Sequence, residues 1–141
     1  PYIKLRPYQI YGPKKKKNRL IPQTIDTCFK NKIFPCTSGM QKRDFIYIDD
    51  FVHLIQKILV NKNIRYETFN VGSGKPVLVK SIVKKIQNFT KSGIPKFGAI
   101  SMRTDEIMNL YPSIKKVSKY FNWSPKVKLN RGLKKTIKSY A

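Results

Sequence analysis

Apolar residues along the chain follow two spacings, one typical of strands and one typical of helices. Short runs of β-branched and aromatic residues at 2–5, 45–48 and 69–71 predict strands. Helical spacing predicts helices with these apolar faces: Ile21, Ile25, Cys28 and Phe29; Val52, Ile55, Ile58 and Leu59; Val79, Ile82, Val83, Ile86 and Phe89; Leu133, Ile137 and Tyr140. A further helix is expected around 114–121. Strands that alternate with helices predict an α/β or α+β fold.

Residues 39–50 concentrate a loop, a strand and a helix start in one short stretch. Asp49 and Asp50 offer an N-cap and a first-turn acid for a helix that begins at Phe51. Arg43-Asp44 precedes the strand, so the guanidinium can bind phosphate oxygens at the end of a sheet. The alternative is an Arg-Asp pair on the surface.

Proline and glycine predict several element boundaries. The first strand should end at Arg6-Pro7, because proline removes a ladder donor. Pro22 should lie in the first turn of a helix that runs to about Asn31. Gly12-Pro13 predicts a turn, and Ser92-Gly93 the end of the helix over 79–89.

Length and composition suit one globular domain or part of one. The chain has 141 residues, of which 40% are hydrophobic, and no run reaches membrane-spanning length. It begins Pro-Tyr within an apparent strand and shows no signal peptide, so we expect a cytoplasmic fragment that lacks its N-terminal part. Such a fragment should neither bind NAD(P) well nor turn over substrate alone.

The charge is extreme, with 30 Lys and Arg against 7 Asp and Glu, or +23. One hypothesis is a basic nucleic-acid-binding module. The other is a codon bias toward lysine, since lysines are scattered over every predicted element and 14–17 is the only run. No RNA-binding or zinc-finger motif accompanies them, so no specific nucleic-acid partner is expected. Cys28 and Cys36 have no metal-ligand spacing and are expected to be reduced thiols.

The sequence contains no catalytic motif. Its arginines suggest a binding site instead. There is no glycine-rich dinucleotide motif, P-loop or zinc-protease motif. Tyr11 and Lys15 have Tyr-x-x-x-Lys spacing, but Gly12-Pro13 between them rules out the helix that this pair needs. Four of the six arginines are Arg6, Arg19, Arg43 and Arg103, and three of these four stand at element boundaries. Arginine kept where lysine is the usual cation suggests a need for fork geometry, and a diphosphate fits that geometry.

Several segments together resemble one known family. They are Leu-Arg-Pro-Tyr-Gln-Ile-Tyr-Gly-Pro at 5–13, Arg-Leu-Ile-Pro at 19–22, Arg-Asp-Phe-Ile-Tyr-Ile-Asp-Asp at 43–50, Phe-Asn-Val-Gly-Ser-Gly at 69–74, Phe-Asn-Trp-Ser-Pro at 121–125 and Arg-Gly-Leu at 131–133. In this order they resemble the C-terminal half of extended short-chain dehydrogenases/reductases, the NAD-dependent nucleotide-sugar epimerases and dehydratases. The details around Arg43 and Arg103 look nearest to the 4-keto-6-deoxy sugar reductase/epimerase branch.

The resemblance implies an α/β fold made of the C-terminal part of a Rossmann-type parallel sheet plus a small α/β substrate-binding domain. Residues 1–13 would end the Rossmann-type domain, 14–141 would mainly bind substrate, and 43–61 would return to the sheet. The implied activity is hydride transfer at C4 of a nucleoside-diphosphate hexose, with NAD or NADP as cofactor. The implied assembly is a homodimer, and the catalytic Tyr-x-x-x-Lys would lie upstream.

The resemblance also assigns residues by position. Tyr8 would meet the cofactor ribose, and Gln9 stands where the family usually has a substrate-binding Asn. Leu78 replaces a common capping residue. Substrate contacts are implied for Gln9, Arg19, Leu20, Ile21, Phe34, Pro35, Cys36, Arg43, Asn70 and Arg103, and no catalytic or metal-binding residue is assigned.

Overall fold

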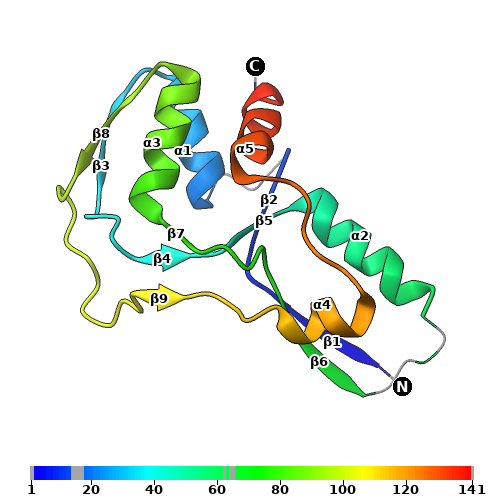
Figure 1. Ribbon diagram of the computed structural model, residues 1–141. Helices are drawn as coiled ribbons and strands as arrows, with labels where there is room; N and C mark the ends of the chain where they lie inside the picture. Colours follow the sequence, from blue (N-terminus) through cyan, green and yellow to red (C-terminus); the bar gives the residue numbers. More distant parts are fainter. Residues whose placement is uncertain (1, 14–17, 62, 64–65, 141) are drawn as a thin grey trace.

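The computed structural model describes residues 2–13, 18–61, 63 and 66–140 (Figure 1). The strands are β1 (Ile3–Pro7), β2 (Gln9–Tyr11), β3 (Ile33–Cys36), β4 (Lys42–Arg43), β5 (Phe45–Tyr47), β6 (Glu67–Val71), β7 (Val77–Leu78), β8 (Ile94–Phe97) and β9 (Asn109–Leu110). The helices are α1 (Leu20–Phe29), α2 (Ile48–Leu59), α3 (Val79–Thr90), α4 (Lys115–Phe121) and α5 (Leu129–Lys138). The predicted α/β class is confirmed.

β1 and β2 form one extended path that changes partner at Tyr8. β1 pairs in parallel with β6, and β2 pairs in parallel with β5. At the change, the Tyr8 amide donates to the Val71 carbonyl at 2.9 Å, and the Gln9 amide donates to the Asp44 carbonyl at 3.2 Å. The ends of β1 and β6 therefore lie beside the start of β5, which brings residues 6–9, 44 and 71 to one place.

Two smaller strand groups flank this path. β3 pairs in parallel with β8, and β4 lies between β7, its antiparallel partner, and β9, its parallel partner. Figure 1 shows β3 and β8 beside α1 and α3, with the connection from β8 to β9 along the outside of the molecule. β4 leads directly into β5, so residues 42–47 join the group of β7, β4 and β9 to the β1–β2 path.

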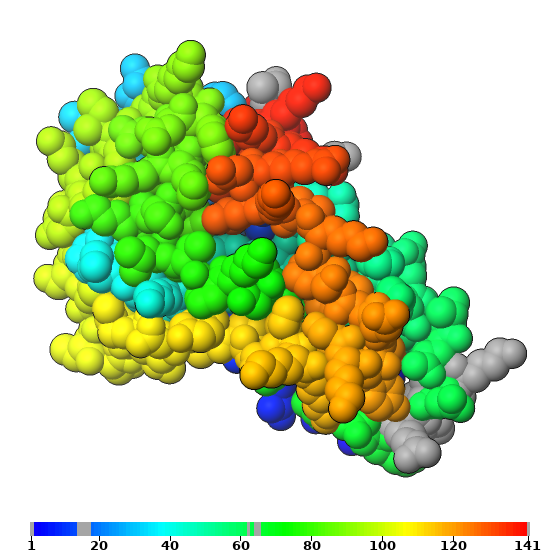
Figure 2. All heavy atoms as spheres, viewed as in Figure 1, coloured from blue at the N-terminus to red at the C-terminus, as the bar shows by residue number. Residues whose placement is uncertain are grey.

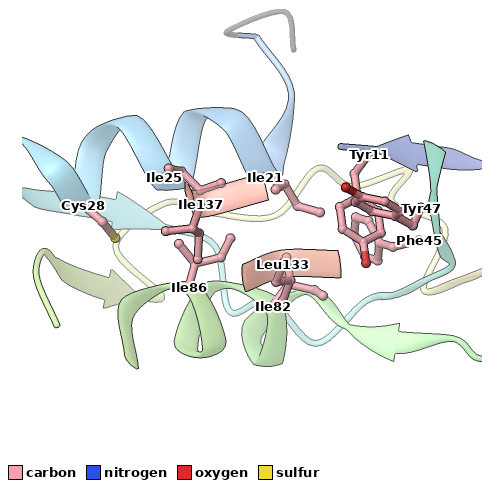
Figure 3. Close-up of a cluster of buried hydrophobic side chains, with 10 residues drawn as sticks. All are labelled: Tyr11, Ile21, Ile25, Cys28, Phe45, Tyr47, Ile82, Ile86, Leu133 and Ile137. Carbon is pink, nitrogen blue, oxygen red and sulfur yellow. The ribbon is translucent and has the colours of Figure 1, made fainter. Parts of the chain in front are cut away.

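The first hydrophobic core lies among α1, α3 and α5. These helices lie side by side, and buried side chains of β2 and β5 close one end of the core (Figures 1 and 3). At that end Tyr11 and Tyr47 meet edge to face with ring centroids 5.4 Å apart. The buried members are Tyr11, Ile21, Ile25, Cys28, Phe45, Tyr47, Ile82, Ile86, Leu133 and Ile137.

The second core lies between the β1–β6 pair, α2 and α4. Phe69 on β6 contacts the rings of Tyr120 and Phe121, both with centroids 5.1 Å away. Its buried members are Ile46, Leu54, Ile58, Phe69, Val71, Val117, Phe121 and Trp123. Ile46 and Tyr47 are neighbours in β5, and they enter different cores because successive strand residues face opposite sides.

Asp50 fixes the connection between α4 and α5. Its carboxylate oxygens accept the amides of Lys126 and Val127 at 2.8 and 2.9 Å, and its carbonyl accepts the Trp123 indole N–H at 3.2 Å. The carboxylate is buried, yet two backbone donors satisfy it. Asp50 therefore ties α2 to a segment more than 70 residues away.

Some predicted boundaries are wrong. β1 continues through Arg6 and Pro7, because Pro7 pairs with Val71 while β1 has no second neighbour among the described residues, a position that tolerates proline. α2 begins at Ile48 with Tyr47 as N-cap, so Asp49 is not the cap, although both aspartates lie in the first turn. α1 starts at Leu20, which places Pro22 in its first turn as predicted, but it ends at Phe29 rather than near Asn31. α3 ends at Thr90 with Lys91 in the left-handed conformation, ahead of the predicted end at Ser92-Gly93.

The predicted apolar face of α2 is also partly wrong. Leu54 and Ile58 are buried with Phe51 packed beside them, whereas Val52 is 45% exposed and Leu59 76% exposed. The apolar residues of this helix allow two buried faces that differ by about one residue of rotation. The face with Leu54 and Ile58 is the buried one, in the same core as Ile46 and Trp123. Among the described residues no helix is both long and apolar enough to cross a bilayer.

Candidate functional site

A pocket of about 720 Å³ opens beyond the carboxyl end of β1. Ligands of parallel α/β sheets bind at this end of the strands. Its walls come from the β1–β2 path, the start of α1, β5 and β9. The lining residues are Arg6, Pro7, Tyr8, Gln9, Ile10, Tyr11, Arg19, Leu20, Ile21, Pro22, Phe45 and Leu110.

The charged groups of this lining are cationic, and a helix start adds to them. Arg6 and Arg19 both contribute, and no Asp or Glu of the described residues lines the pocket. Arg19 is the N-cap of α1, no side chain in the part of the chain that the structure describes caps that end, and the first turn holds no acid. Helix starts carry partial positive charge and free N–H groups that anions satisfy. This end of α1 therefore favours an anion.

The pocket brings together five of the residues that the resemblance assigns to cofactor or substrate. Tyr8 is half-buried and Gln9 is exposed, both at the change of strand partner. Arg19, Leu20 and Ile21 stand at the α1 start. The amide of Tyr8 is used by Val71, so the phenol ring and the carbonyl are what this residue offers to a ligand.

Tyr11 is a packing residue in this structure. It lies in β2, and its hydroxyl donates to the Leu129 carbonyl at 3.4 Å. Burial, with Tyr47 and Asp50 nearby, raises the pKa of Tyr11 well above its ordinary value. A catalytic tyrosine needs the opposite shift, which agrees with the rejection of the Tyr11–Lys15 pair. Lys15 and the rest of the lysine run at 14–17 lie outside the described residues.

Arg43 lies next to the pocket rather than in its wall. Its register partner on β9 is Leu110, which does line the pocket. The guanidinium Nη1 donates to the carbonyls of Lys42 and Ile107, each at 2.7 Å, and Nη2 forms an ion pair with Glu106. The alternative of a surface Arg43–Asp44 pair is therefore wrong.

Asp44 has a separate role, fixing the turn after β6. It is fully buried, and its two carboxylate oxygens accept the amides of Ser73 and Gly74 at 2.6 and 2.7 Å. A Cβ on Gly72 would lie 2.6 Å from Pro112 and 3.0 Å from Asp44, so this turn needs glycine for close approach. The aspartate thus joins the start of β5 to the end of β6.

The other assigned residues do not line this pocket. Phe34, Pro35 and Cys36 lie on β3 opposite β8, with Phe34 packed on the first core. Asn70 is exposed on β6 opposite Arg6, and Arg103 is exposed ahead of β9. Cys28 and Cys36 are both free thiols.

The family resemblance assigned no substrate contact to Arg6 or Leu110, although Arg6 is one of the four arginines that the sequence suggested for a diphosphate. Arg6 carried a usable signal, since it stands at the end of a strand in a chain where lysine is the usual cation. Leu110 lies at the pocket because β9 pairs with β4, and no local sequence pattern predicts this pairing. No group of three or more His, Cys, Asp or Glu in the described part of the chain could hold a metal ion.

Comparison with known proteins identifies the family. Residues 1–72, about half of the chain, match the profile described as "NAD dependent epimerase/dehydratase family". The chain belongs to this family.

Curated relatives align along nearly the whole chain. It is 35% identical over 138 residues to a CDP-abequose synthase of Salmonella muenchen, covering 96% of the chain and 47% of the relative. It is 28% identical over 135 residues to a UDP-glucuronate 4-epimerase of Thermodesulfobacterium geofontis, covering 94% and 41%. The chain spans about half the length of the curated relatives that it matches.

Solved structures share the fold. A UDP-glucuronic acid 4-epimerase from Bacillus cereus, in complex with UDP-glucuronic acid and NAD, matches with a TM-score of 0.82 at 26% identity, over 96% of this chain and 43% of that one. A UDP-glucose 4-epimerase from Thermotoga maritima with UDP-glucose gives a TM-score of 0.85 at 23% identity, covering 99% and 45%. The predicted α/β fold with a Rossmann-type parallel sheet is therefore confirmed.

Proposed function

We propose that this chain is the C-terminal, substrate-binding part of an NAD(P)-dependent enzyme that acts by hydride transfer at C4 of a nucleoside-diphosphate hexose. Family membership supports the reaction class. The observation that carries the proposal is the pocket that combines Arg6, Arg19 and the uncapped start of α1. In the full-length enzyme, residues 1–13 and 43–61 belong to the Rossmann-type domain and the rest mainly to the substrate domain, in a cytoplasmic homodimer.

The diphosphate is the part of the ligand that this pocket fits best. Two arginines and the N–H groups of a helix start offer charge-assisted hydrogen bonds to several oxygens at once. A pocket of about 720 Å³ is within the range of small-molecule sites, so it has room for more than an inorganic anion. Gln9 is exposed on the same wall, where its amide can contact a sugar hydroxyl.

Only one residue of this chain, Tyr8, is assigned to the cofactor in this proposal. Tyr8 is half-buried at the carboxyl end of β1, where a nicotinamide-bearing cofactor of such a fold would lie, and its hydroxyl and carbonyl suit a ribose. Bound NAD or NADP supplies hydride transfer. In this proposal Tyr8 orients the cofactor, and Arg19 with the start of α1 binds the substrate.

Calorimetry on the full-length protein tests this proposal. UDP, CDP and dTDP are titrated against the matching monophosphates, and at least one diphosphate should bind more tightly than its monophosphate. Arg19→Gln should weaken diphosphate binding by ~1–3 kcal/mol, the scale of a charge-assisted hydrogen bond. Arg131→Gln is the matched control, since it removes the same charge from the exposed face of α5, away from the pocket.

Two results would contradict the proposal. One is equal affinity for diphosphates and monophosphates, and the other is an equal loss in both arginine variants. Binding of a nucleic-acid oligomer with a steep salt dependence, together with small additive losses from any lysine or arginine, would favour the basic-module hypothesis instead.

A further inference from the structure

Arg43 holds two unused donors while the rest of its guanidinium is fixed. A guanidinium has five N–H groups. Two on Nη1 bind the carbonyls of Lys42 and Ile107, and one on Nη2 pairs with Glu106. Within the described residues no partner is seen for the Nε–H or for the second Nη2–H. These two donors are the number that one bidentate phosphate contact needs.

Glu106 limits how far the Arg43 side chain can move. An unpaired arginine side chain loses rotamer entropy when a ligand fixes it. Here Lys42, Ile107 and Glu106 fix it in advance, and its side chain is only 13% exposed. A ligand that binds Arg43 then meets a group already oriented, which removes part of the cost of binding.

The same ion pair anchors the turn that carries Arg103. The Glu106 amide donates to the Arg103 carbonyl at 3.2 Å, so the two residues close one turn. The next strand, β9, is held to β4 by its pairing with Lys42 and Arg43. Figure 2 shows the segment around this turn (yellow) along one edge of the visible face, against the atoms of β4 and the chain before it (cyan). Arg43, Glu106 and Arg103 therefore form one connected unit.

We propose that Glu106 is a positioning residue for Arg43. It holds the guanidinium so that the two remaining donors face a ligand phosphate beside the pocket, at the Leu110 side. This inference rests on the proposed function, because it needs a diphosphate ligand. Glu106 itself acts on that phosphate only through Arg43, since a carboxylate repels it.

The test is a double-mutant cycle in the full-length protein, with calorimetric binding of UDP, CDP or dTDP, whichever the unaltered protein binds most tightly. Glu106→Gln and Arg43→Lys are measured singly and together. Asp105→Asn is the matched control, because it removes the same charge one residue away on an exposed side chain. Thermal unfolding of each variant shows that the fold is retained.

We expect Glu106→Gln to weaken diphosphate binding about 5- to 20-fold, with little change for the nucleoside monophosphate and little effect of Asp105→Asn. Combined with Arg43→Lys, the Glu106 change should add little. A full additive loss in the double variant, or equal losses in Glu106→Gln and Asp105→Asn, would overturn the role of Glu106. Tight diphosphate binding by the unaltered protein would still stand in those cases, whereas its absence would refute the proposed function itself.

Discussion

Two neighbouring parts of the molecule are held in opposite ways. Residues 44–50 are mostly buried, and Asp44 and Asp50 each bind two backbone amides from distant segments. Residues 98–111 are mostly exposed, including the apolar side chains of Ile107 and Tyr111. Apart from the short strand β9, this second segment is held by the contacts of Arg43 with Ile107 and Glu106 and by single hydrogen bonds from Ser38 to Met102 and between Ile100 and Cys36.

The two segments therefore differ in rigidity. Buried carboxylates that are fully hydrogen-bonded fix backbone at the cost of desolvation, so Asp44 and Asp50 specify a rigid frame. The segment 98–111 has few buried contacts, so it can adjust beside the pocket without disturbing the cores. Each segment contributes one residue to the lining of the pocket, Phe45 from the first and Leu110 from the second.

The largest effect should come from Asp44→Ala. It removes two charge-assisted hydrogen bonds, to the amides of the half-buried Ser73 and the exposed Gly74, each of which is worth about 1.5–3 kcal/mol, so we expect a loss of ~3–5 kcal/mol in the free energy of unfolding. Denaturant unfolding measures it. Asp49→Ala is the control, since Asp49 is exposed and its Lys135 contact is 3.4 Å long; we expect at most about 1 kcal/mol there. Equal losses would show that the frame does not depend on buried carboxylates.

Gly132→Ala should destabilise the fold where α5 packs on Tyr11 and Tyr47. An added Cβ would lie 2.2 Å from the Tyr11 hydroxyl and 3.0 Å from Tyr47, so we expect a cost of ~1–3 kcal/mol from overpacking. Tyr11→Phe in the same chain removes the closest atom and should recover part of the loss. If thermal unfolding shows the two changes to be strictly additive, the contact is not the cause.

Alkaline pH should weaken the same contact. Burial raises the pKa of Tyr11 above its ordinary 10.0, so the folded state keeps a proton that the unfolded chain releases. This stabilisation is complete below about pH 10 and falls by up to ~1.4 kcal/mol per pH unit above it. Tyr11→Phe should make stability flatter with pH in this range. An unchanged slope would mean that Tyr11 does not control the alkaline limit.

The smallest effect on global stability should come from Glu106→Ala. Arg43 keeps its two carbonyl partners without Glu106, and the ion pair holds only residues 98–111, so we expect about 1 kcal/mol. Hydrogen exchange should report the change locally, at the Lys42 amide that donates to the Met108 carbonyl at 2.7 Å. A loss as large as that for Asp44→Ala would place residues 98–111 in the frame.

The sequence predicted the frame better than the site. The spacing of Ile82, Val83 and Ile86 and the run at 45–48 are local signals, and the helix and strand that they predict are present. The roles of Asp44 and Asp50 were not predictable, because their partners are backbone amides 29 and 76 residues away. The pocket wall at Leu110 depends on a two-residue strand, which is too short to leave a pattern.

The contact of Tyr11 with α5 also bears on how the chain folds during synthesis. The Tyr11 hydroxyl bonds a carbonyl 118 residues later, so the aromatic end of the first core cannot be covered until α5 has been made. At 5–20 residues per second this takes roughly 6 to 24 s, during which Tyr11 and Tyr47 lack the helix that covers them. A nascent chain stopped before Gly132 should therefore be more sensitive to protease and more dependent on chaperones than one stopped after it.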